Sequence, residues 1–308
     1  MFKFERDDMN NFKDLEKRIP LTVPKDYKNI YLQNLNKITK NTGKLFLFAG
    51  DQKIEHLNKD FYGKNISVES ADPEHLFKIA NSGYIGCFAT QLGLISRYGN
   101  DYKNINYIVK LNSKTDIVQT KQSEPISALL NTVQDVVEFK NDSGLSIVGV
   151  GYTIYLGSEN EHIMLSQASN IINQAHKNGL IVILWIYPRG NAVKNELDPE
   201  IIAGACGVAV SLGADFVKIN NPGKENLKNC VTAAGRTGVL LAGGKQKETE
   251  LFLEELYEQV NKFKISGCAI GRNIHQKNLD NAIRLCKAIY GIVYENIILN
   301  DAKNYLKE

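Results

Sequence analysis

The sequence has few cysteines, no long apolar run and almost no excess of charge. Its five cysteines among 308 residues form no CxxC pair, and its longest apolar run, LIVILWIY at 180–187, has only eight residues. A disulfide framework needs regularly spaced cysteines, and a membrane helix needs about 20 apolar residues. The opening MFKFERDDMN contains acids and lacks the apolar stretch of a signal peptide. We therefore expect a cytoplasmic protein with reduced thiols and no membrane contact.

Basic and acidic residues nearly balance: 37 lysines and arginines against 34 aspartates and glutamates give a net charge of +3. An excess this small argues against a nucleic-acid partner, which needs a concentrated basic surface. The histidines form neither an HxxH nor an HExxH pattern, so we expect no bound metal ion. The five histidines are His56, His75, His162, His176 and His275.

Short apolar runs recur along the chain, and most of them are continuous rather than alternating. Continuous runs are typical of parallel strands that are covered on both faces. The predicted strands are 44–50, 84–88, 106–111, 146–155, 180–187, 215–220, 238–244 and 267–273. The helical stretches that follow them are near 73–82, 91–98, 127–140, 160–178, 198–213, 226–235, 247–263 and 278–290.

Alternation of strand and helix through eight units predicts a (β/α)8 barrel. We expect a single barrel domain over 44–308 with a helical C-terminal end, preceded by an N-terminal extension over 1–43 that contains a helix at 25–42. A doubly wound open sheet is the alternative, but no GxGxxG pattern follows the first strand. In a barrel, chemistry is expected at the C-terminal ends of the strands and in the loops after them.

Lys218 is the first candidate functional residue, because it falls inside the sixth predicted strand, DFVKIN. Side chains alternate across a strand, so Lys218 faces opposite to Val217 and Ile219, whose apolar side chains suit the helix layer. Lys218 then points into the barrel, where burial lowers the pKa of a lysine from about 10.4 toward neutrality. A neutral amine can attack a carbonyl to form a Schiff base. The alternative is a lysine that reaches solvent or pairs with an acid.

The motif WIYPRG at 185–190 ends the fifth predicted strand. Trp185 and Tyr187 share one face by the same alternation, and Arg189 begins the loop. A tyrosine near an amine can transfer a proton, and a lysine-derived cation beside it is expected to lower the pKa of the phenol. The arginine suits an anionic substrate. The alternative is an aromatic core pair followed by a surface arginine.

Two glycine loops follow the last two predicted strands. Gly243 and Gly244 lie in AGGK at 242–245, and Gly271 and Arg272 lie in GRN at 271–273. Barrels often bind phosphate between these two loops, through backbone N–H groups that glycine allows to approach closely. Arg272 adds a charged fork of donors. The alternative is that these glycines only form turns.

The motif GDQKIEH at 50–56 ends the first predicted strand. Asp51 at the strand end can orient a hydroxyl or tune a nearby amine, and Glu55 and His56 follow in the loop. The alternative is a solvated polar loop.

Taken together, these motifs resemble the archaeal-type class I fructose-bisphosphate aldolases, Schiff-base aldolases of the DeoC/LacD-like group. The resemblance covers roughly 44–290 and rests on GDQKIEH, VGYTIYLGSE, WIYPRG, FVKIN, LAGG and AIGRNIHQ, in that order. It implies a lyase that cleaves fructose 1,6-bisphosphate to dihydroxyacetone phosphate and glyceraldehyde 3-phosphate. It also implies a large homo-oligomer, and a covalent lysine in place of a metal or other cofactor.

The resemblance implies three catalytic residues. Lys218 would form the Schiff base with the C2 carbonyl of the ketose, Tyr187 would transfer the proton at carbon, and Asp51 would contact substrate hydroxyls and assist carbinolamine chemistry.

It also implies a set of substrate-binding residues. Trp185 would shape the pocket, while His56 and Arg189 would meet the far end of the substrate. The residues implied to hold the dihydroxyacetone-phosphate end are Gly243, Gly244, Gly271 and Arg272. The family commonly has histidine and glycine after the aspartate, whereas this chain has Gln52 and Lys53.

Two alternatives keep the same fold. One is a sibling aldolase: a 2-amino-3,7-dideoxy-threo-hept-6-ulosonate synthase or an enzyme for another sugar phosphate. The other is a non-catalytic barrel that binds a sugar phosphate. Mere binding needs neither a buried amine nor a nearby phenol, so the presence of both Lys218 and Tyr187 favours an enzyme.

Overall fold

The computed structural model describes residues 19–56, 60–118 and 124–307. Its centre is a closed barrel with the strand order β1-β10-β9-β8-β7-β6-β3-β2, in which neighbouring strands are parallel. The predicted (β/α)8 barrel is therefore confirmed. The barrel strands are β1 (Leu45–Ala49), β2 (Cys87–Thr90), β3 (Tyr107–Lys110), β6 (Ile147–Leu156), β7 (Ile181–Pro188), β8 (Phe216–Ile219), β9 (Gly238–Ala242) and β10 (Gly267–Ile270).

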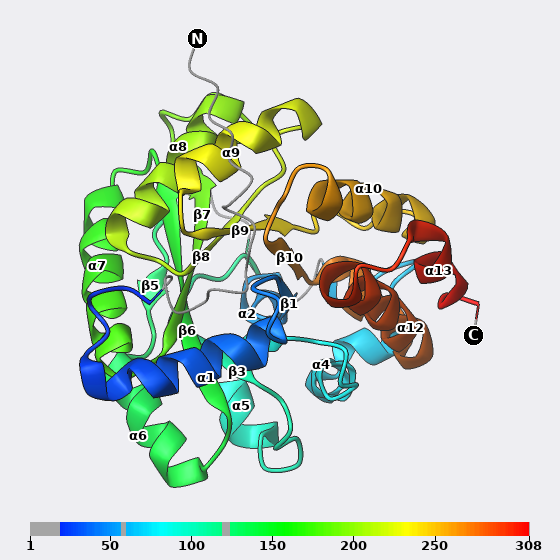
Figure 1. Ribbon diagram of the computed structural model, residues 1–308, viewed down its shortest axis with the longest axis horizontal. Helices are drawn as coiled ribbons and strands as arrows, with labels where there is room; N and C mark the ends of the chain where they lie inside the picture. The colour runs from blue at the N-terminus through cyan, green and yellow to red at the C-terminus, as the bar shows by residue number, and fades with distance from the viewer. Residues whose placement is uncertain (1–18, 57–59, 119–123, 308) are drawn as a thin grey trace.

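Helices surround the strands in chain order, from α4 at the lower right of Figure 1 through α7 on the left to α12 on the right. The outer helices are α4 (Pro73–Ala80), α5 (Leu92–Tyr98), α6 (Val133–Ser143), α7 (Glu161–Lys177), α8 (Pro199–Leu212), α9 (Leu227–Ala234), α10 (Thr249–Asn261) and α12 (Leu279–Tyr290). The chain ends in the π-helical turn η5 (Gly291–Glu295) and α13 (Leu299–Asn304). Shorter helices are η2 (Lys25–Tyr27), α2 (Gln52–Glu55), η3 (Val68–Ala71), η4 (Lys224–Asn226) and α11 (Arg272–His275).

Local sequence explains where several helices begin and end. Both α4 and α8 begin with proline after an aspartate, Asp72 or Asp198, whose side chain accepts a hydrogen bond from a free N–H of the first turn. Gly213 ends α8 with a φ of 95°, a left-handed conformation that glycine adopts without strain.

The apolar core has two layers, one inside the barrel and one between the barrel and its helices. On β8, Phe216 belongs to the inner cluster, whereas Val217 and Ile219 pack in the outer cluster. Lys218 therefore faces the barrel interior, as the alternation predicts.

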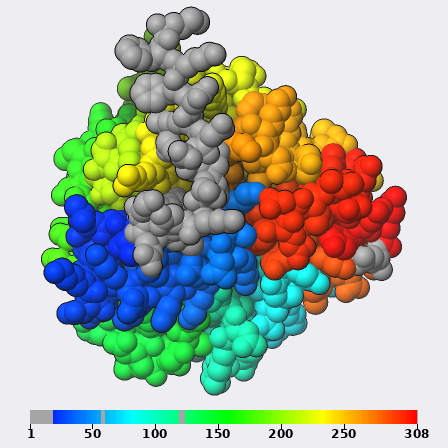
Figure 2. Space-filling view, viewed as in Figure 1, coloured from blue at the N-terminus to red at the C-terminus, as the bar shows by residue number. Residues whose placement is uncertain are grey.

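Helix α1 (Lys28–Thr39) closes the N-terminal end of the barrel and crosses the front of Figure 1. Its Leu35 and Ile38 join the inner cluster, and the Tyr31 hydroxyl donates to Oδ1 of Asp215 at 2.5 Å. The Tyr294 hydroxyl donates to the carbonyl of Ile38 at 2.8 Å. Figure 2 shows the blue surface of α1 and the red surface of the C-terminal helices on the same face of the molecule.

The predicted helix at 25–42 is thus present as η2 and α1. The division into an extension over 1–43 and a barrel domain over 44–308 stays a prediction, and 1–18 lie outside the described residues.

Three predicted boundaries are wrong. The strand expected at 267–273 ends at Ile270, because α11 begins at Arg272. The helix expected from 127 begins at Val133, because Thr132 and Asp135 form a reciprocal capping box there. The residues before it form β5 (Ala128–Leu129), which pairs antiparallel with β4 (Asn112–Ser113). The strand expected at 84–88 is displaced to β2 at 87–90.

The described part of the chain contains no helix long and apolar enough to cross a membrane. All five cysteines are buried and free.

Candidate active site

A pocket of about 240 Å³ opens at the C-terminal ends of the barrel strands, and its lining includes all ten residues that the sequence singled out. These residues are Asp51, His56, Trp185, Tyr187, Arg189, Lys218, Gly243, Gly244, Gly271 and Arg272. They come from β7, β8 and the segments after β1, β7, β9 and β10, so the barrel brings together residues that are far apart in sequence. The sequence argument did not assign a role to Gln52, Glu55, Thr153, Tyr155, Asn220, Ala242 and Ala269, which complete the lining.

Lys218 lies at the base of this pocket and is only 4% exposed. Its register partner on β7 is Trp185, and Nζ lies 5.4 Å from the centroid of a Trp185 ring. Within the described residues, no side chain or carbonyl accepts a hydrogen bond from Nζ. Burial lowers the pKa of Lys218, although the carboxylate of Asp51 opposes this shift. An amine in this setting can lose its proton and act as a nucleophile.

Lys110, at the end of β3, is a second buried lysine. Unlike Lys218, it has hydrogen-bond acceptors around its amine. Its Nζ donates to the Asn112 carbonyl at 3.0 Å, to Asn112 Oδ1 at 3.2 Å and to Thr153 Oγ1 at 2.7 Å. An ammonium has three donors, and all three are used here. Lys110 is therefore a poor nucleophile. The sequence also indicates this lysine as the next candidate after Lys218, because the alternation of NYIVKL places Ile108 and Lys110 inward.

Trp185 and Tyr187 line the pocket from β7, as expected. A Cβ on Gly151 would lie 2.5 Å from the Trp185 ring, so glycine at this position of β6 makes room for the indole. The pKa of Tyr187 is raised well above its ordinary value by burial, with Asp51 and Glu55 adding to the shift. Burial is the main cause of this raised pKa in the free enzyme, and the lowering expected beside a lysine-derived cation stays a prediction.

The loop after β1 supplies the negative charge of the pocket. Oδ1 of Asp51 is buried without a hydrogen-bond partner among the described residues. Burial raises the pKa of Glu55, but its interactions with His56 and Lys110 outweigh burial and lower the pKa overall. Nε2 of His56 lies 3.6 Å from Oε2 of Glu55. The pocket therefore holds an ionised carboxylate in addition to Lys218.

Asn273 fastens the two glycine loops to each other. Its Nδ2 donates to the Gly243 carbonyl at 2.8 Å, and its Oδ1 accepts from the Lys247 N–H at 2.9 Å. A Cβ on Gly271 would lie 2.7 Å from the Ala49 carbonyl, so only glycine fits there. Sequence reasoning missed the role of Asn273, although it is the third residue of the GRN motif.

Arg272, after β10, and Arg189, after β7, both provide positive charge to the pocket. Nε of Arg272 is buried without a partner among the described residues, and its Nη1 lies 3.6 Å from Oδ1 of Asp60. The guanidinium of Arg189 lies 5.3 Å from the centroid of the Tyr155 ring. Nε of Arg189 lies 3.3 Å from Oε1 of Glu196. Both guanidiniums can meet anionic groups of a bound molecule.

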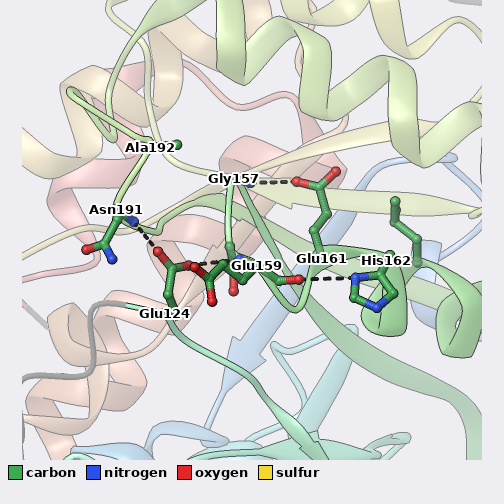
Figure 3. A pocket seen from close by; sticks show the side chains of 9 residues that line it. Glu124, Gly157, Glu159, Glu161, His162, Asn191 and Ala192 are labelled. Carbon is green, nitrogen blue, oxygen red and sulfur yellow. Dashed lines mark hydrogen bonds between the residues drawn. The ribbon is translucent and has the colours of Figure 1, made fainter.

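A second pocket, of about 520 Å³, is lined in part by Asn191 and Ala192 of the loop after β7 (Figure 3). Oε1 of Glu124 accepts from the Asn191 N–H at 3.0 Å, and its Oε2 accepts from the Glu159 N–H at 2.8 Å. Oε2 of Glu161 accepts from the Gly157 N–H at 2.6 Å. Glu124 therefore links the loops after β6 and β7, and Glu161 stabilises the loop after β6 itself.

The two residues that depart from the resembled family have different positions. Gln52 lines the pocket. Lys53 points away from it: Nζ donates to the carbonyl of Ala71 at 2.6 Å and lies 4.1 Å from the centroid of the Phe61 ring. Lys53 therefore anchors the loop after β1 to η3.

Histidines, cysteines and carboxylates do not gather into a group of three or more that could hold a metal ion anywhere in 19–56, 60–118 and 124–307. Of the five histidines, only His56 lines the pocket.

Comparison with known proteins agrees with this geometry. The model of the DeoC/LacD family of aldolases matches residues 45–277. A protein of Methanocaldococcus jannaschii named fructose-bisphosphate aldolase/6-deoxy-5-ketofructose 1-phosphate synthase is 58% identical over 96% of this chain and 96% of its own. The solved structure of a fructose-bisphosphate aldolase from Slackia heliotrinireducens is 49% identical, with a TM-score of 0.90 over 94% of this chain and 93% of its own.

A solved archaeal fructose-1,6-bisphosphate aldolase is 33% identical, with a TM-score of 0.74 over 86% of this chain and 99% of its own. That structure is described as having the catalytic lysine covalently bound to the carbinolamine intermediate of the substrate. The family match covers most of the chain, and the three relatives cover 96%, 94% and 86% of it. This chain belongs to the DeoC/LacD family of aldolases and is a lyase.

Proposed function

We propose that the protein is a class I, Schiff-base fructose-bisphosphate aldolase of glycolysis and gluconeogenesis, acting in the cytoplasm. The observation that carries this proposal is the environment of Lys218, a buried amine without a hydrogen-bond partner among the described residues, facing a pocket that Tyr187 and Asp51 also line. The substrate would be fructose 1,6-bisphosphate, and the products would be dihydroxyacetone phosphate and glyceraldehyde 3-phosphate. The homo-oligomer that the resemblance implies stays a prediction.

The reaction would begin when the neutral amine of Lys218 attacks the C2 carbonyl to give a carbinolamine. Loss of water forms an iminium, which serves as an electron sink. The C4 hydroxyl then loses its proton, the C3–C4 bond breaks, and its electron pair moves into the iminium to give an enamine. Glyceraldehyde 3-phosphate leaves at this step. Protonation at C3 and hydrolysis of the new iminium release dihydroxyacetone phosphate and restore the amine.

Tyr187 and Asp51 are suited to the proton transfers. A raised pKa keeps the Tyr187 phenol protonated in the free enzyme, and the positive iminium would then make the proton easier to remove. The unpartnered Oδ1 of Asp51 is free to accept a hydrogen bond from a substrate hydroxyl or from the carbinolamine.

The pocket offers separate positions for the two ends of the substrate. The glycine loops with Arg272 would hold the C1 phosphate, while His56 and Arg189 would meet the far end. Trp185 would form the wall between Lys218 and the interior of the barrel.

The name of the Methanocaldococcus jannaschii relative supports a second candidate activity, 6-deoxy-5-ketofructose 1-phosphate synthesis. Breaking the C3–C4 bond of that sugar gives dihydroxyacetone phosphate and 2-oxopropanal (methylglyoxal). The same enamine on Lys218 would therefore add to methylglyoxal instead of glyceraldehyde 3-phosphate. The second activity needs no new catalytic group, only a pocket that admits an acceptor without phosphate.

Borohydride trapping tests the proposed chemistry. Wild-type protein treated with dihydroxyacetone phosphate and borohydride in EDTA should gain one covalent adduct, located on Lys218 by peptide mass spectrometry. Lys218→Met should abolish the adduct, and Lys245→Met, which removes an exposed lysine after β9, should retain it. An adduct in Lys218→Met would place the nucleophile elsewhere. A need for added zinc would replace the Schiff base by Lewis-acid catalysis.

Product analysis separates the two activities. Cleavage of fructose 1,6-bisphosphate without an added acceptor supports the aldolase. Formation of 6-deoxy-5-ketofructose 1-phosphate from fructose 1,6-bisphosphate plus methylglyoxal supports the synthase. Inactivity toward both, with the adduct still present, would indicate another sugar-phosphate aldolase.

A further inference from the structure

Two buried lysines approach the same side chain from different strands. Nζ of Lys110 lies 5.3 Å, and Nζ of Lys218 5.4 Å, from the centroid of a Trp185 ring. The charge of Lys110 lowers the pKa of Lys218, and burial disfavours the charge on each lysine. The pair will therefore divide its protons unequally, with one lysine charged and the other neutral.

The hydrogen-bond partners decide which lysine keeps its proton. Asn112 presents both its carbonyl and Oδ1 to Nζ of Lys110. The Asn112 amide is held in this orientation because its Nδ2 donates to the carbonyls of Ser127 and Thr153, at 3.2 and 2.9 Å. Its Oδ1 also accepts from the Thr153 N–H at 2.7 Å. Acceptors fixed in this way stabilise the ammonium form of Lys110.

Lys110 is also separated from the pocket. It is 1% exposed, and it is absent from the pocket lining, to which Thr153 and Trp185 belong. With its three donors already used inside the protein, Lys110 has none to offer a substrate. Any effect of Lys110 on the reaction must therefore act through Lys218.

We propose that Lys110 is a positioning residue that stays permanently protonated behind Trp185 and whose charge drives the proton off Lys218. This inference rests on the proposed Schiff-base function and adds a dedicated cation to it. An adjacent cation is one of the general ways in which a lysine nucleophile is activated.

The other charged groups around the pair are consistent with this division. Asp51, Glu55 and Arg272 face Lys218, together with Lys110, and the Tyr187 phenol lines the same pocket. The same two carboxylates face Lys110.

Burial lowers the pKa of both lysines, and Asp51 and Glu55 oppose the shift in both. The two carboxylates therefore act in the same direction on both lysines. The acceptors on Asn112 and Thr153 make the difference, and Lys218 gives up its proton first.

The pH dependence of Schiff-base formation tests this proposal. The rate of borohydride trapping of dihydroxyacetone phosphate is measured from pH 5 to pH 10, since the acid limb reports loss of the proton from Lys218. Lys110→Met removes the cation, so the limb should move upward by about one pH unit. Lys140→Met removes a lysine from α6, in the outer layer, and should leave the limb in place.

A second variant keeps the test decisive if Lys110→Met does not fold. Thr153→Val preserves shape but removes one acceptor from Lys110, so the limb should move in the same direction by less. If a folded variant forms the adduct with its acid limb at the same pH as in the wild-type protein, the proposed role of Lys110 is overturned. Absence of any adduct in the wild-type protein would instead overturn the Schiff-base function.

Discussion

Trp185 and Lys218 are register partners on neighbouring parallel strands, and the indole forms the wall against which the amine rests. Two residues further along the same face of β7, Tyr187 reaches the pocket above them. Because Trp185 pairs in register with Lys218, the position of the Tyr187 phenol along the barrel axis is fixed relative to the Lys218 amine. A three-carbon unit bound to Lys218 would therefore lie beside the hydroxyl of Tyr187.

Tyr187→Phe should separate covalent binding from turnover. The substitution removes only the hydroxyl, so the fold and the Schiff base on Lys218 should survive, and the borohydride adduct should form. Turnover of fructose 1,6-bisphosphate should fall by roughly 10²–10⁴, the usual range for loss of a general acid–base. Exchange of solvent protons at C3 of bound dihydroxyacetone phosphate, followed by NMR, should slow in parallel. Wild-type turnover and exchange would make Tyr187 a packing residue and Asp51 the better proton carrier.

Arg272→Ala should weaken binding of the C1 phosphate. Loss of a charged hydrogen bond should reduce kcat/KM for fructose 1,6-bisphosphate by the equivalent of about 1.5–3 kcal/mol. Cleavage of a ketose 6-phosphate, which lacks the C1 phosphate, should change little. Steady-state kinetics with both substrates make the comparison, and equal damage to both would place Arg272 elsewhere. Asp60→Asn is a useful companion, because it weakens the ion pair of Arg272 without removing the guanidinium.

Glu124→Ala should loosen the loops that carry Arg189. The variant removes the acceptor for the N–H groups of Glu159 and Asn191 (Figure 3), so the far end of the pocket should become less well ordered. We expect kcat/KM for fructose 1,6-bisphosphate to fall about threefold to tenfold, a loss typical of one or two hydrogen bonds. The borohydride adduct should be retained. Glu138→Ala, on the exposed side of α6, is the matched control. If both variants lower kcat/KM equally, Glu124 has no special role in holding these loops.

The barrel and the residues that line its pocket could be predicted from the sequence, because both depend on short-range patterns. Alternation on β8 puts Lys218 inward, and strand ends converge at one mouth in a barrel. The same rules place Tyr187 and the glycine loops without any knowledge of distant contacts. The one-turn helix α2 and the hairpin of β4 and β5 were missed, because such short elements are set by tertiary contacts rather than by periodicity.

The electrostatics of the site could be predicted only in part: the pKa of Lys218 is lowered by burial as expected, but the pKa of Tyr187 could not be predicted from sequence. The direction of the Tyr187 pKa depends on the balance between burial, nearby carboxylates and Arg189, which requires three-dimensional positions. The difference between Lys110 and Lys218 likewise depends on where Asn112 lies, a residue that no motif singles out.

His275 is a buried basic group next to the active site. Its ring stacks on Phe61 with centroids 4.4 Å apart, and Nδ1 lies 3.0 Å from Oγ of Ser70. Its Nε2 is buried without a partner among the described residues. Burial, with smaller contributions from His75, Lys53 and Arg272, lowers the pKa of His275 to about 3.

This lowered pKa should make the protein sensitive to acid. Above pH 6.5, the ordinary pKa of histidine, His275 is neutral in the folded and unfolded states and contributes no pH dependence. Below it only the unfolded state binds the proton, so stability falls as the pH drops toward about 3. Between pH 7 and pH 5 this amounts to about 2 kcal/mol, at 1.36 kcal/mol per pH unit. His275→Phe keeps a ring against Phe61 but cannot titrate. The free energy of unfolding in urea should therefore fall between pH 7 and pH 5 by about 2 kcal/mol less in this variant than in the wild-type protein. An equal fall in both proteins would show that other groups cause the acid sensitivity.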